Sequence, residues 1–189
     1  MKECIFMGTF DPFHNGHLML IEKLSKEYDV VYVFIAKNYL KFEKRMFTPE
    51  IMRQAISKTI SENGIKNVVC VDESQFLPCV CLSKKLKCNN FVRGVRPEDA
   101  LFEFALRKVN SIFGLKTYYC PSGSDCSSRK IKEDFKNNKD ISNLVPKEVF
   151  KLFQEKQKKH VQISEMQKNL DSDSNNNEVK TGFCGERKI

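Results

Sequence analysis

Short apolar runs alternate with helix-forming segments along most of the chain, and this alternation constrains the fold more than any other feature of the sequence. The run at residues 29–36 (DVVYVFIA) has no polar side, which is typical of a strand buried on both faces of a parallel sheet. Similar short runs occur at residues 4–7, 67–71, 90–92 and 116–120. Strands that alternate with helices predict a three-layer α/β fold with a five-stranded parallel sheet.

Capping residues mark where the helical segments begin and end. Thr48-Pro49-Glu50 has the threonine, proline and acid that favour a helix start, and Asn63-Gly64 favours the end of that helix. We expect other helices around residues 18–24, 76–86, 98–112, 127–135 and 146–153, with Ser127 or Ser128 as a cap. The apolar sides of two helices consist of Ile51, Met52, Ala55, Ile56 and Ile60, and of Leu101, Phe102, Ala105, Leu106 and Val109.

The composition changes near the C-terminal end. The 189 residues are enough for one domain with a tail. From residue 154 onward Lys, Gln, Asn, Ser and Asp predominate, and few apolar residues are available to offset the entropy of chain ordering. We therefore expect one domain over residues 1–153 and a tail over residues 154–189, a frayed helix followed by disorder.

Charge and cysteine usage limit the classes of partner. The net charge of +8 suits either nucleic acid or a small anionic substrate, but no nucleic-acid motif or basic-aromatic platform is present. We therefore expect a small anion, with no nucleic acid and no membrane as partner. No signal peptide or transmembrane helix is expected from the N-terminal residues. Cysteines such as Cys4, Cys70, Cys79, Cys81 and Cys120 lie in apolar runs, which predicts buried free thiols and a cytoplasmic location.

The segment Gly8 to His17 (GTFDPFHNGH) joins the first expected strand to the first expected helix. It holds two of the three histidines, His14 and His17, which share one face of a helix start. Free N–H groups at a helix N-terminus, with imidazoles beside them, suit a polyphosphate. Taken alone, the spacing also fits two surface histidines, or a zinc site for which only Cys4 and Asp11 lie nearby. Glycine-rich phosphate loops of the Walker or dinucleotide type are absent from the sequence.

Three further stretches with side chains suited to catalysis or binding also follow expected strands: residues 37–45, 93–96 and 121–132. Ligands of open α/β sheets bind outside the carboxyl ends of the strands, so these stretches are expected at one edge. Each has an ordinary alternative when taken alone: a solvated basic loop, surface ion pairs of Arg93 and Arg96, or a helix N-cap at Ser127-Ser128. Their ordered occurrence after successive strands favours a single site.

The four stretches together resemble those of the phosphopantetheine adenylyltransferases, members of the nucleotidyltransferase superfamily with a His-x-Gly-His motif, here His14 to His17. The resemblance covers about residues 2–153. The most discriminating block is Val92-Arg93-Gly94-Val95-Arg96 followed by an acidic, aromatic helix start, and Ser127 to Lys132 resembles the Ser-Ser-x-x-Ile-Arg/Lys motif. The resemblance implies a Rossmann-like nucleotidyltransferase fold. It also implies adenylyl transfer from ATP to 4′-phosphopantetheine, which yields dephospho-coenzyme A and pyrophosphate in coenzyme A biosynthesis.

The resemblance also implies a role for each matched residue. His17, Lys41 and Arg93 would be catalytic, and Thr9, Lys41 and Arg93 would hold the substrate phosphate. The ATP side would comprise Thr9, Phe10, His14, His17, Gly94, Arg96, Glu103, Ser127 and Ser128. We expect Mg²⁺ to accompany ATP without a protein metal site of its own. A homo-oligomer is also implied.

Departures from the family pattern leave alternatives open. Two residues are added between Lys41 and Met46, so a shifted alignment favours Lys44 as the active-site lysine. The loop before Ser127 is shorter than in the bacterial family. The alternative functions are a nicotinate-mononucleotide adenylyltransferase, another nucleotidyltransferase acting on a small phosphate, such as a cytidylyltransferase, and a non-catalytic nucleotide-binding sensor.

Overall fold

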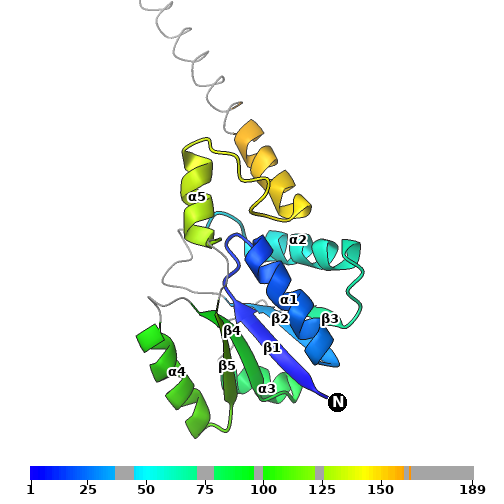
Figure 1. The fold of residues 1–189 in the computed structure, drawn as a ribbon, viewed down its shortest axis with the longest axis vertical. Helices are drawn as coiled ribbons and strands as arrows, with labels where there is room; N and C mark the ends of the chain where they lie inside the picture. Colours follow the sequence, from blue (N-terminus) through cyan, green and yellow to red (C-terminus); the bar gives the residue numbers. More distant parts are fainter. Residues whose placement is uncertain (37–44, 72–78, 96–99, 122–125, 160–161, 163–189) are drawn as a thin grey trace, which may run out of the picture. The chain divides into compact units, whose positions relative to one another are not determined.

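The computed structural model describes residues 1–36, 45–71, 79–95, 100–121, 126–159 and 162. Within these ranges, five strands form one sheet in the order β3-β2-β1-β4-β5, and every neighbouring pair is parallel (Figure 1). The strands are β1 (Glu3–Gly8), β2 (Val30–Ile35), β3 (Val68–Val71), β4 (Asn90–Val95) and β5 (Lys116–Pro121). The predicted α/β fold with a five-stranded parallel sheet is confirmed.

Helices connect the strands and cover both faces of the sheet. They are α1 (Asn15–Glu27), α2 (Pro49–Glu62), α3 (Cys79–Leu86), α4 (Ala100–Ile112) and α5 (Ser128–Lys136). Figure 1 shows α1 and α2 on one face and α3 and α4 on the other, as right-handed crossovers of a doubly wound sheet require. The expected starts of two helices at residues 76 and 98 lie outside the described residues.

Strand β1 lies in the centre of the sheet and is buried on both faces. Ile5 and Met7 pack against Leu82 of α3, whereas the ring of Phe6 lies 6.3 Å from that of His17 in α1. Alternate side chains of a strand point to opposite faces, so a strand covered by helices on both sides has to be apolar throughout. The runs at residues 4–7 and 29–36 are thereby confirmed as buried strands. In the edge strands β3 and β5, by contrast, Val69 and Tyr118 are 49% and 46% exposed.

The caps of α2 and α5 agree with the sequence. Thr48 Oγ1 accepts a hydrogen bond from the amide of Ile51, and Ser127 Oγ accepts one from the amide of Lys130. Each cap satisfies a donor of the first helical turn that has no partner inside the helix. Ser127, rather than Ser128, is therefore the N-cap of α5.

The apolar side of α4 is directed away from the sheet. The spacing of the apolar residues therefore did not reveal which side of this helix packs against the sheet. Leu101 is 84% exposed and Val109 is 51% exposed, whereas Glu103 and Asn110 are buried. Asn110 Nδ2 donates to Thr117 Oγ1 of β5 at 3.0 Å, so polar side chains join this helix to the sheet. A smaller correction concerns α2, where Ile51 is 41% exposed although the other predicted apolar residues are buried.

The chain divides into two compact units, Met1–Phe150 and Lys151–Ile189. In the first unit, residues 147–150 are helical and follow α5. In the second, residues 151–159 are helical, which extends past the expected helix end at residue 153. Most residues beyond 159 lie outside the described part, so the predicted domain boundary and the disordered tail stay predictions.

The cysteines of the described ranges are free thiols. Of the five cysteines expected to be buried, only Cys4 is buried, and Cys81 is exposed. The other three are half-buried: Cys70, Cys79 and Cys120. Burial, followed by the neighbouring Cys88 and Cys120, raises the pKa of the Cys4 thiol to about 12. In the part of the chain that the structure describes, we find no helix with the length and apolar character needed to cross a bilayer.

Candidate active site

The sheet changes its winding direction between β1 and β4. The chain passes from β1 outward to β2 and β3, then crosses to β4 and continues outward to β5. Phe6 of β1 pairs with Val92 of β4, so the segments that follow the two strands leave the sheet side by side. Such a switch point is where ligands bind in open α/β sheets.

The turn after β1 is built around a buried phenylalanine. Phe10 adopts a left-handed backbone conformation with φ of 43°, and the following Asp11–Pro12 peptide bond is cis. The Phe10 ring lies 5.2 Å from that of Phe6 and 5.8 Å from that of Phe13. A Cβ atom on Gly8 would come within 2.9 Å of the Phe10 ring, so glycine is required for this close approach.

His14 and His17 lie together at the start of α1, as predicted. Their rings stack with 3.6 Å between centroids, and the amide of His14 donates to Nδ1 of His17 at 3.3 Å. Because Nδ1 accepts this bond, the neutral ring of His17 carries its hydrogen on Nε2. Phe13 stacks on the same ring at 5.6 Å and Phe10 meets it edge-on at 5.0 Å. The result is a fixed N–H donor of the kind that stabilises charge developing on an oxygen.

Part of the N-terminus of α1 is already occupied by protein acceptors. The amide of Asn15 donates to the carbonyl of Leu144 at 3.0 Å, and its Nδ2 donates to the carbonyl of Asn143 at 2.9 Å. The expected set of free N–H groups for a polyphosphate therefore does not include that of Asn15. The loop at residues 143–144 instead holds the first turn of the helix in place.

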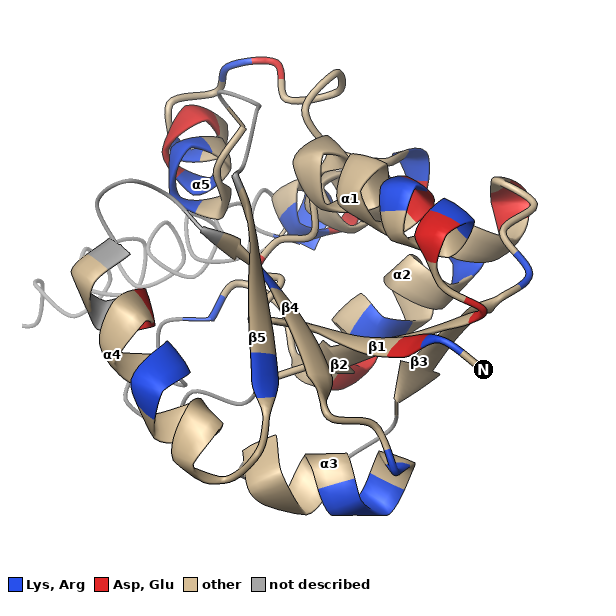
Figure 2. Cartoon of the chain, turned by 60° about the horizontal axis from the view of Figure 1, so that its bottom comes forward, with Lys and Arg blue, Asp and Glu red and all other residues tan. Residues whose placement is uncertain are grey.

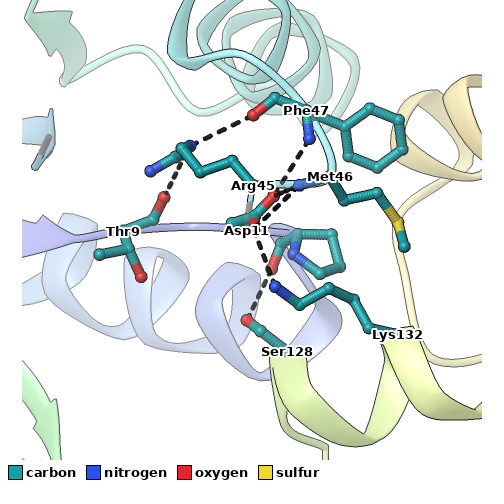
Figure 3. A network of polar contacts seen from close by, with 8 residues as sticks. Thr9, Asp11, Arg45, Met46, Phe47, Ser128 and Lys132 are labelled. Atoms are coloured by element: carbon teal, nitrogen blue, oxygen red, sulfur yellow. Dashed lines mark hydrogen bonds and ion pairs between the residues drawn. The ribbon is translucent and has the colours of Figure 1, made fainter. Parts of the chain in front are cut away.

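Asp11 is the centre of a polar network that the sequence did not reveal (Figure 3). Its carboxylate accepts hydrogen bonds from the amide of Met46 at 3.0 and 3.2 Å and from the amide of Phe47 at 3.2 Å. Lys132 Nζ of α5 lies 2.8 Å from Oδ2 of the same carboxylate, and the Asp11 side chain is 8% exposed. The Asp11 carboxylate is therefore a hydrogen-bond acceptor that holds neighbouring segments in place. Within the described residues, no group of three metal-ligating side chains exists for zinc.

Two further contacts tie the same turn to its neighbours. Arg45 Nη2 donates to the carbonyl of Thr9 at 2.8 Å and its Nε donates to the carbonyl of Phe47 at 3.2 Å. Burial lowers the pKa of the Arg45 guanidinium, while the carboxylates of Asp11 and Glu50 act in the opposite direction. Ser128 Oγ donates to the carbonyl of Pro12 at 2.9 Å. The predicted residues Thr9 and Ser128 are thus brought to one place.

Arg93 and Glu103 form an ion pair at the end of β4. Arg93 Nη2 lies 2.7 Å from Glu103 Oε1, and the two side chains are 21% and 9% exposed. The hydroxyl of Tyr119 donates to the backbone carbonyl of Glu103, which places the first turn of α4 against β5. Within the described residues, Arg93 Nε and Glu103 Oε2 are buried without a hydrogen-bond partner.

Unsatisfied buried polar atoms of this kind are available to a ligand. Leaving one unpaired costs about 1–3 kcal/mol, which a bound polar group can recover. Among the described residues, a Cβ atom on the neighbouring Gly94 would meet no atom within 4 Å. The remaining predicted residues, Lys41, Lys44 and Arg96, lie outside the described part of the chain, and the choice between the two lysines stays open.

The sequence of this chain is similar to those of known enzymes. The cytidylyltransferase-like family model matches residues 5–165. Phosphopantetheine adenylyltransferase of Desulfotalea psychrophila is 33% identical over 161 residues, which cover 80% of this chain and 91% of the relative. The enzyme of the same name from Lactobacillus acidophilus is 32% identical over 162 residues, covering 82% and 98%. That from Campylobacter jejuni is 34% identical over 152 residues, covering 77% and 92%.

The chain belongs to the phosphopantetheine adenylyltransferase family. The resemblance found in the four sequence stretches is thereby confirmed. A solved structure of a candidate nicotinate-nucleotide adenylyltransferase from Vibrio parahaemolyticus matches with a TM-score of 0.57. It covers 81% of this chain and 99% of its own, but at 24% identity the likeness concerns the fold alone. The phosphopantetheine adenylyltransferase family therefore carries the functional argument.

Proposed function

We propose that this chain transfers the adenylyl group of ATP to 4′-phosphopantetheine and releases pyrophosphate, the reaction named by its relatives. The observation that carries the proposal is the arrangement at the switch point. A fixed imidazole donor at His17 follows β1, and Arg93 lies in the adjacent β4, two residues before that strand ends. Within the described residues, the Nε–H group of Arg93 has no hydrogen-bond partner. Such donors suit a reaction between two anions.

The chemistry requires no covalent intermediate on the protein. A phosphate oxygen of 4′-phosphopantetheine attacks the α-phosphorus of ATP in line, a new P–O bond forms, and the bond to pyrophosphate breaks. His17 donates a hydrogen bond from its Nε2–H group to an oxygen of the α-phosphate as negative charge develops there. Arg93 holds the attacking phosphate through its guanidinium fork, and Lys41 or Lys44 neutralises it as a point charge.

The ATP side uses backbone groups as much as side chains. The Phe10 ring is buried, so its contact to the nucleotide is with its main chain. The Ser127 hydroxyl accepts from the amide of Lys130, and the Ser128 hydroxyl donates to the Pro12 carbonyl. The amides of Ser128 and Arg129 at the start of α5 are therefore proposed to hold the β- and γ-phosphates. Glu103 Oε2 accepts from the ribose or the adenine. The proposed ATP contacts also include Thr9, His14, Gly94 and Arg96.

Mg²⁺ accompanies ATP in this proposal. The ion would arrive on the triphosphate and keep most of its waters, because Mg²⁺ is usually bound through substrate phosphates. When bound, the ion supplies partial neutralisation of the triphosphate charge. The protein donors described above then act on the α-phosphate and the attacking phosphate.

We further propose that the chain forms a homo-oligomer, supported by the apolar side of α4. Leu101, Phe104 and Ile112 are 84%, 57% and 80% exposed. In Figure 2 most of the α4 ribbon belongs to uncharged residues. Contiguous exposed apolar surface marks an interaction site more often than a solvated face. The expected cytoplasmic location and the absence of nucleic-acid and membrane partners stay predictions.

Pyrophosphate release tests the function directly. Purified protein with Mg²⁺ is given ATP or CTP together with 4′-phosphopantetheine, nicotinate mononucleotide or glycerol 3-phosphate. We expect turnover only with ATP and 4′-phosphopantetheine, and its loss in His17→Ala. Turnover with nicotinate mononucleotide instead assigns the chain to that activity, and ATP binding without turnover for any pair supports the sensor alternative.

A further inference from the structure

Three segments that are far apart in the sequence converge on the single carboxylate of Asp11. The amides of Met46 and Phe47 lie 35 and 36 residues away in the sequence, and Lys132 lies 121 residues away. Figure 3 shows the turn after β1, the segment before α2 and helix α5 meeting at this side chain. No other contact shown in that figure joins all three segments through one group.

Charge and burial make this carboxylate effective as a junction. The Asp11 side chain is 8% exposed and that of Lys132 is 29% exposed, so the pair is largely removed from water. A buried carboxylate needs both donors and a compensating charge, and here two amides and one ammonium supply them. Removal of either partner leaves the other polar groups without full compensation.

Each of the three segments carries part of the proposed site. The turn after β1 carries Thr9 and leads into His14 and His17. The segment before α2 contains Arg45, whose Nη2 donates to the Thr9 carbonyl at 2.8 Å. In the sequence, Arg45 directly follows the stretch that holds Lys41 and Lys44. Helix α5 begins beside Ser128, whose hydroxyl donates to the Pro12 carbonyl at 2.9 Å.

We propose that Asp11 is a positioning residue, which holds the segment at residues 45–47 and helix α5 in register with the turn that presents Thr9 and the two histidines. Its kinetic consequence rests on the proposed adenylyl transfer, whereas its structural consequence does not. Lys132 acts through Asp11. Its ammonium group pairs with the Asp11 carboxylate and fixes the orientation in which that carboxylate accepts from the amides of Met46 and Phe47. Small displacements of reacting groups cost large factors in rate, so loss of this register lowers turnover.

The variants are Asp11→Asn, Lys132→Met and the double variant. The side-chain amide introduced by Asp11→Asn keeps one oxygen acceptor for the amides of Met46 and Phe47, so the fold is expected to persist, while the pairing with Lys132 is lost. The matched control is Lys139→Met, which breaks the ion pair between Lys139 and Asp134, whose Nζ and Oδ1 atoms are 3.0 Å apart. All four variants are compared with the wild type below their melting temperatures, with folding checked by circular dichroism.

Two readouts follow. Amide hydrogen exchange at Met46 and Phe47 is expected to quicken at least fivefold in Lys132→Met and Asp11→Asn, and to stay unchanged in Lys139→Met. We expect kcat to fall about tenfold in Asp11→Asn and in Lys132→Met. Because both substitutions break the same contact, the kcat of the double variant is expected to be no lower than that of the slower single variant. Lys139→Met is expected to retain full turnover.

The outcomes separate this proposal from the proposed function. Unchanged exchange at both amides in Lys132→Met overturns the positioning role, as do multiplicative losses of kcat in the double variant. If the wild-type protein itself turns over no substrate pair, the proposed function fails, and hydrogen exchange alone decides the role of Asp11.

Discussion

Two charged clusters lie at the carboxyl edge of the sheet, and they differ in how completely their polar atoms are satisfied. At the end of β1, the Asp11 carboxylate accepts from two amides and pairs with Lys132. At the end of β4, Arg93 and Glu103 pair through one contact, and Arg93 Nε and Glu103 Oε2 are buried without a partner in the described residues.

We infer from this difference that the first cluster holds the protein together and that the second takes part in binding a ligand. A fully satisfied network rigidifies the segments that it joins. Unpaired buried atoms cost about 1–3 kcal/mol each, so a protein that retains them has a use for them. We therefore propose a positioning role for the β1 cluster and a binding role for the β4 cluster.

The largest expected effect concerns His17, which follows the β1 cluster in the chain. His17→Ala removes the Nε2 donor, and we expect kcat to fall about 10²–10³-fold, the usual cost of one donor to the transition state. ATP affinity, measured by calorimetry, is expected to change less than fivefold. A loss in affinity as large as the loss in kcat would instead make His17 a binding residue.

A smaller effect tests whether Arg93 meets the substrate. Arg93→Lys keeps a positive charge for Glu103 but loses the guanidinium fork, and we expect kcat/KM for 4′-phosphopantetheine to fall about 10–100-fold. Steady-state kinetics with that substrate varied measures this. If the Arg93→Lys variant kept full activity, Arg93 would be only a structural partner of Glu103. The β4 cluster would then not differ in role from the β1 cluster.

The next effect concerns Glu103. Glu103→Gln weakens its ion pair and replaces one carboxylate oxygen with an amide donor, so we expect about tenfold weaker ATP binding. Ligand binding raises the melting temperature according to its affinity, and the increase given by ATP should be smaller in the variant. An equal increase in both proteins would contradict a contact between Glu103 and ATP.

The smallest effect concerns the hydroxyl of Tyr119, which donates to the Glu103 carbonyl. Tyr119→Phe is expected to lower the free energy of unfolding by about 1 kcal/mol at neutral pH. Burial, followed by the Glu103 charge, raises the pKa of this phenol above 10.0. A raised pKa means that the contribution is complete below pH 10 and is lost as the pH rises through the folded-state pKa.

Denaturant unfolding of wild type and Tyr119→Phe at several pH values checks this. Because the other titrating groups are common to both proteins, their contributions cancel in the difference. The difference should shrink above pH 10. A constant difference at all pH values would show that the hydroxyl bond is not the cause.

The sheet and the order of its helices could be predicted because their signals are local. The apolar run at residues 29–36 and the cap at Thr48 each reflect residues adjacent in sequence. The same holds for the histidine pair, whose spacing places both rings on one helical face. The four stretches expected to carry the chemistry were recognised because each begins at or near the carboxyl end of a strand.

The polar junction at Asp11 could not be predicted, since its partner Lys132 lies 121 residues away and no local period reports such a pairing. What α4 packs against could not be predicted for a related reason. A hydrophobic period shows which side chains share a face, but not what that face contacts, and Leu101 is 84% exposed. The single signal for Asp11 was its place before proline in the turn.

The central place of β1 has a consequence for the nascent chain. Strand β1 pairs with β2 along its whole length, from Glu3 with Val30 to Gly8 with Ile35. Its other neighbour, β4, begins at Asn90, 87 residues after Glu3. On the ribosome, the first pairing can form early while the second edge of β1 waits for its partner. An unpaired strand edge can pair with strands of other chains. The nascent chain is therefore most prone to aggregation in the interval between the translation of β1 and that of β4.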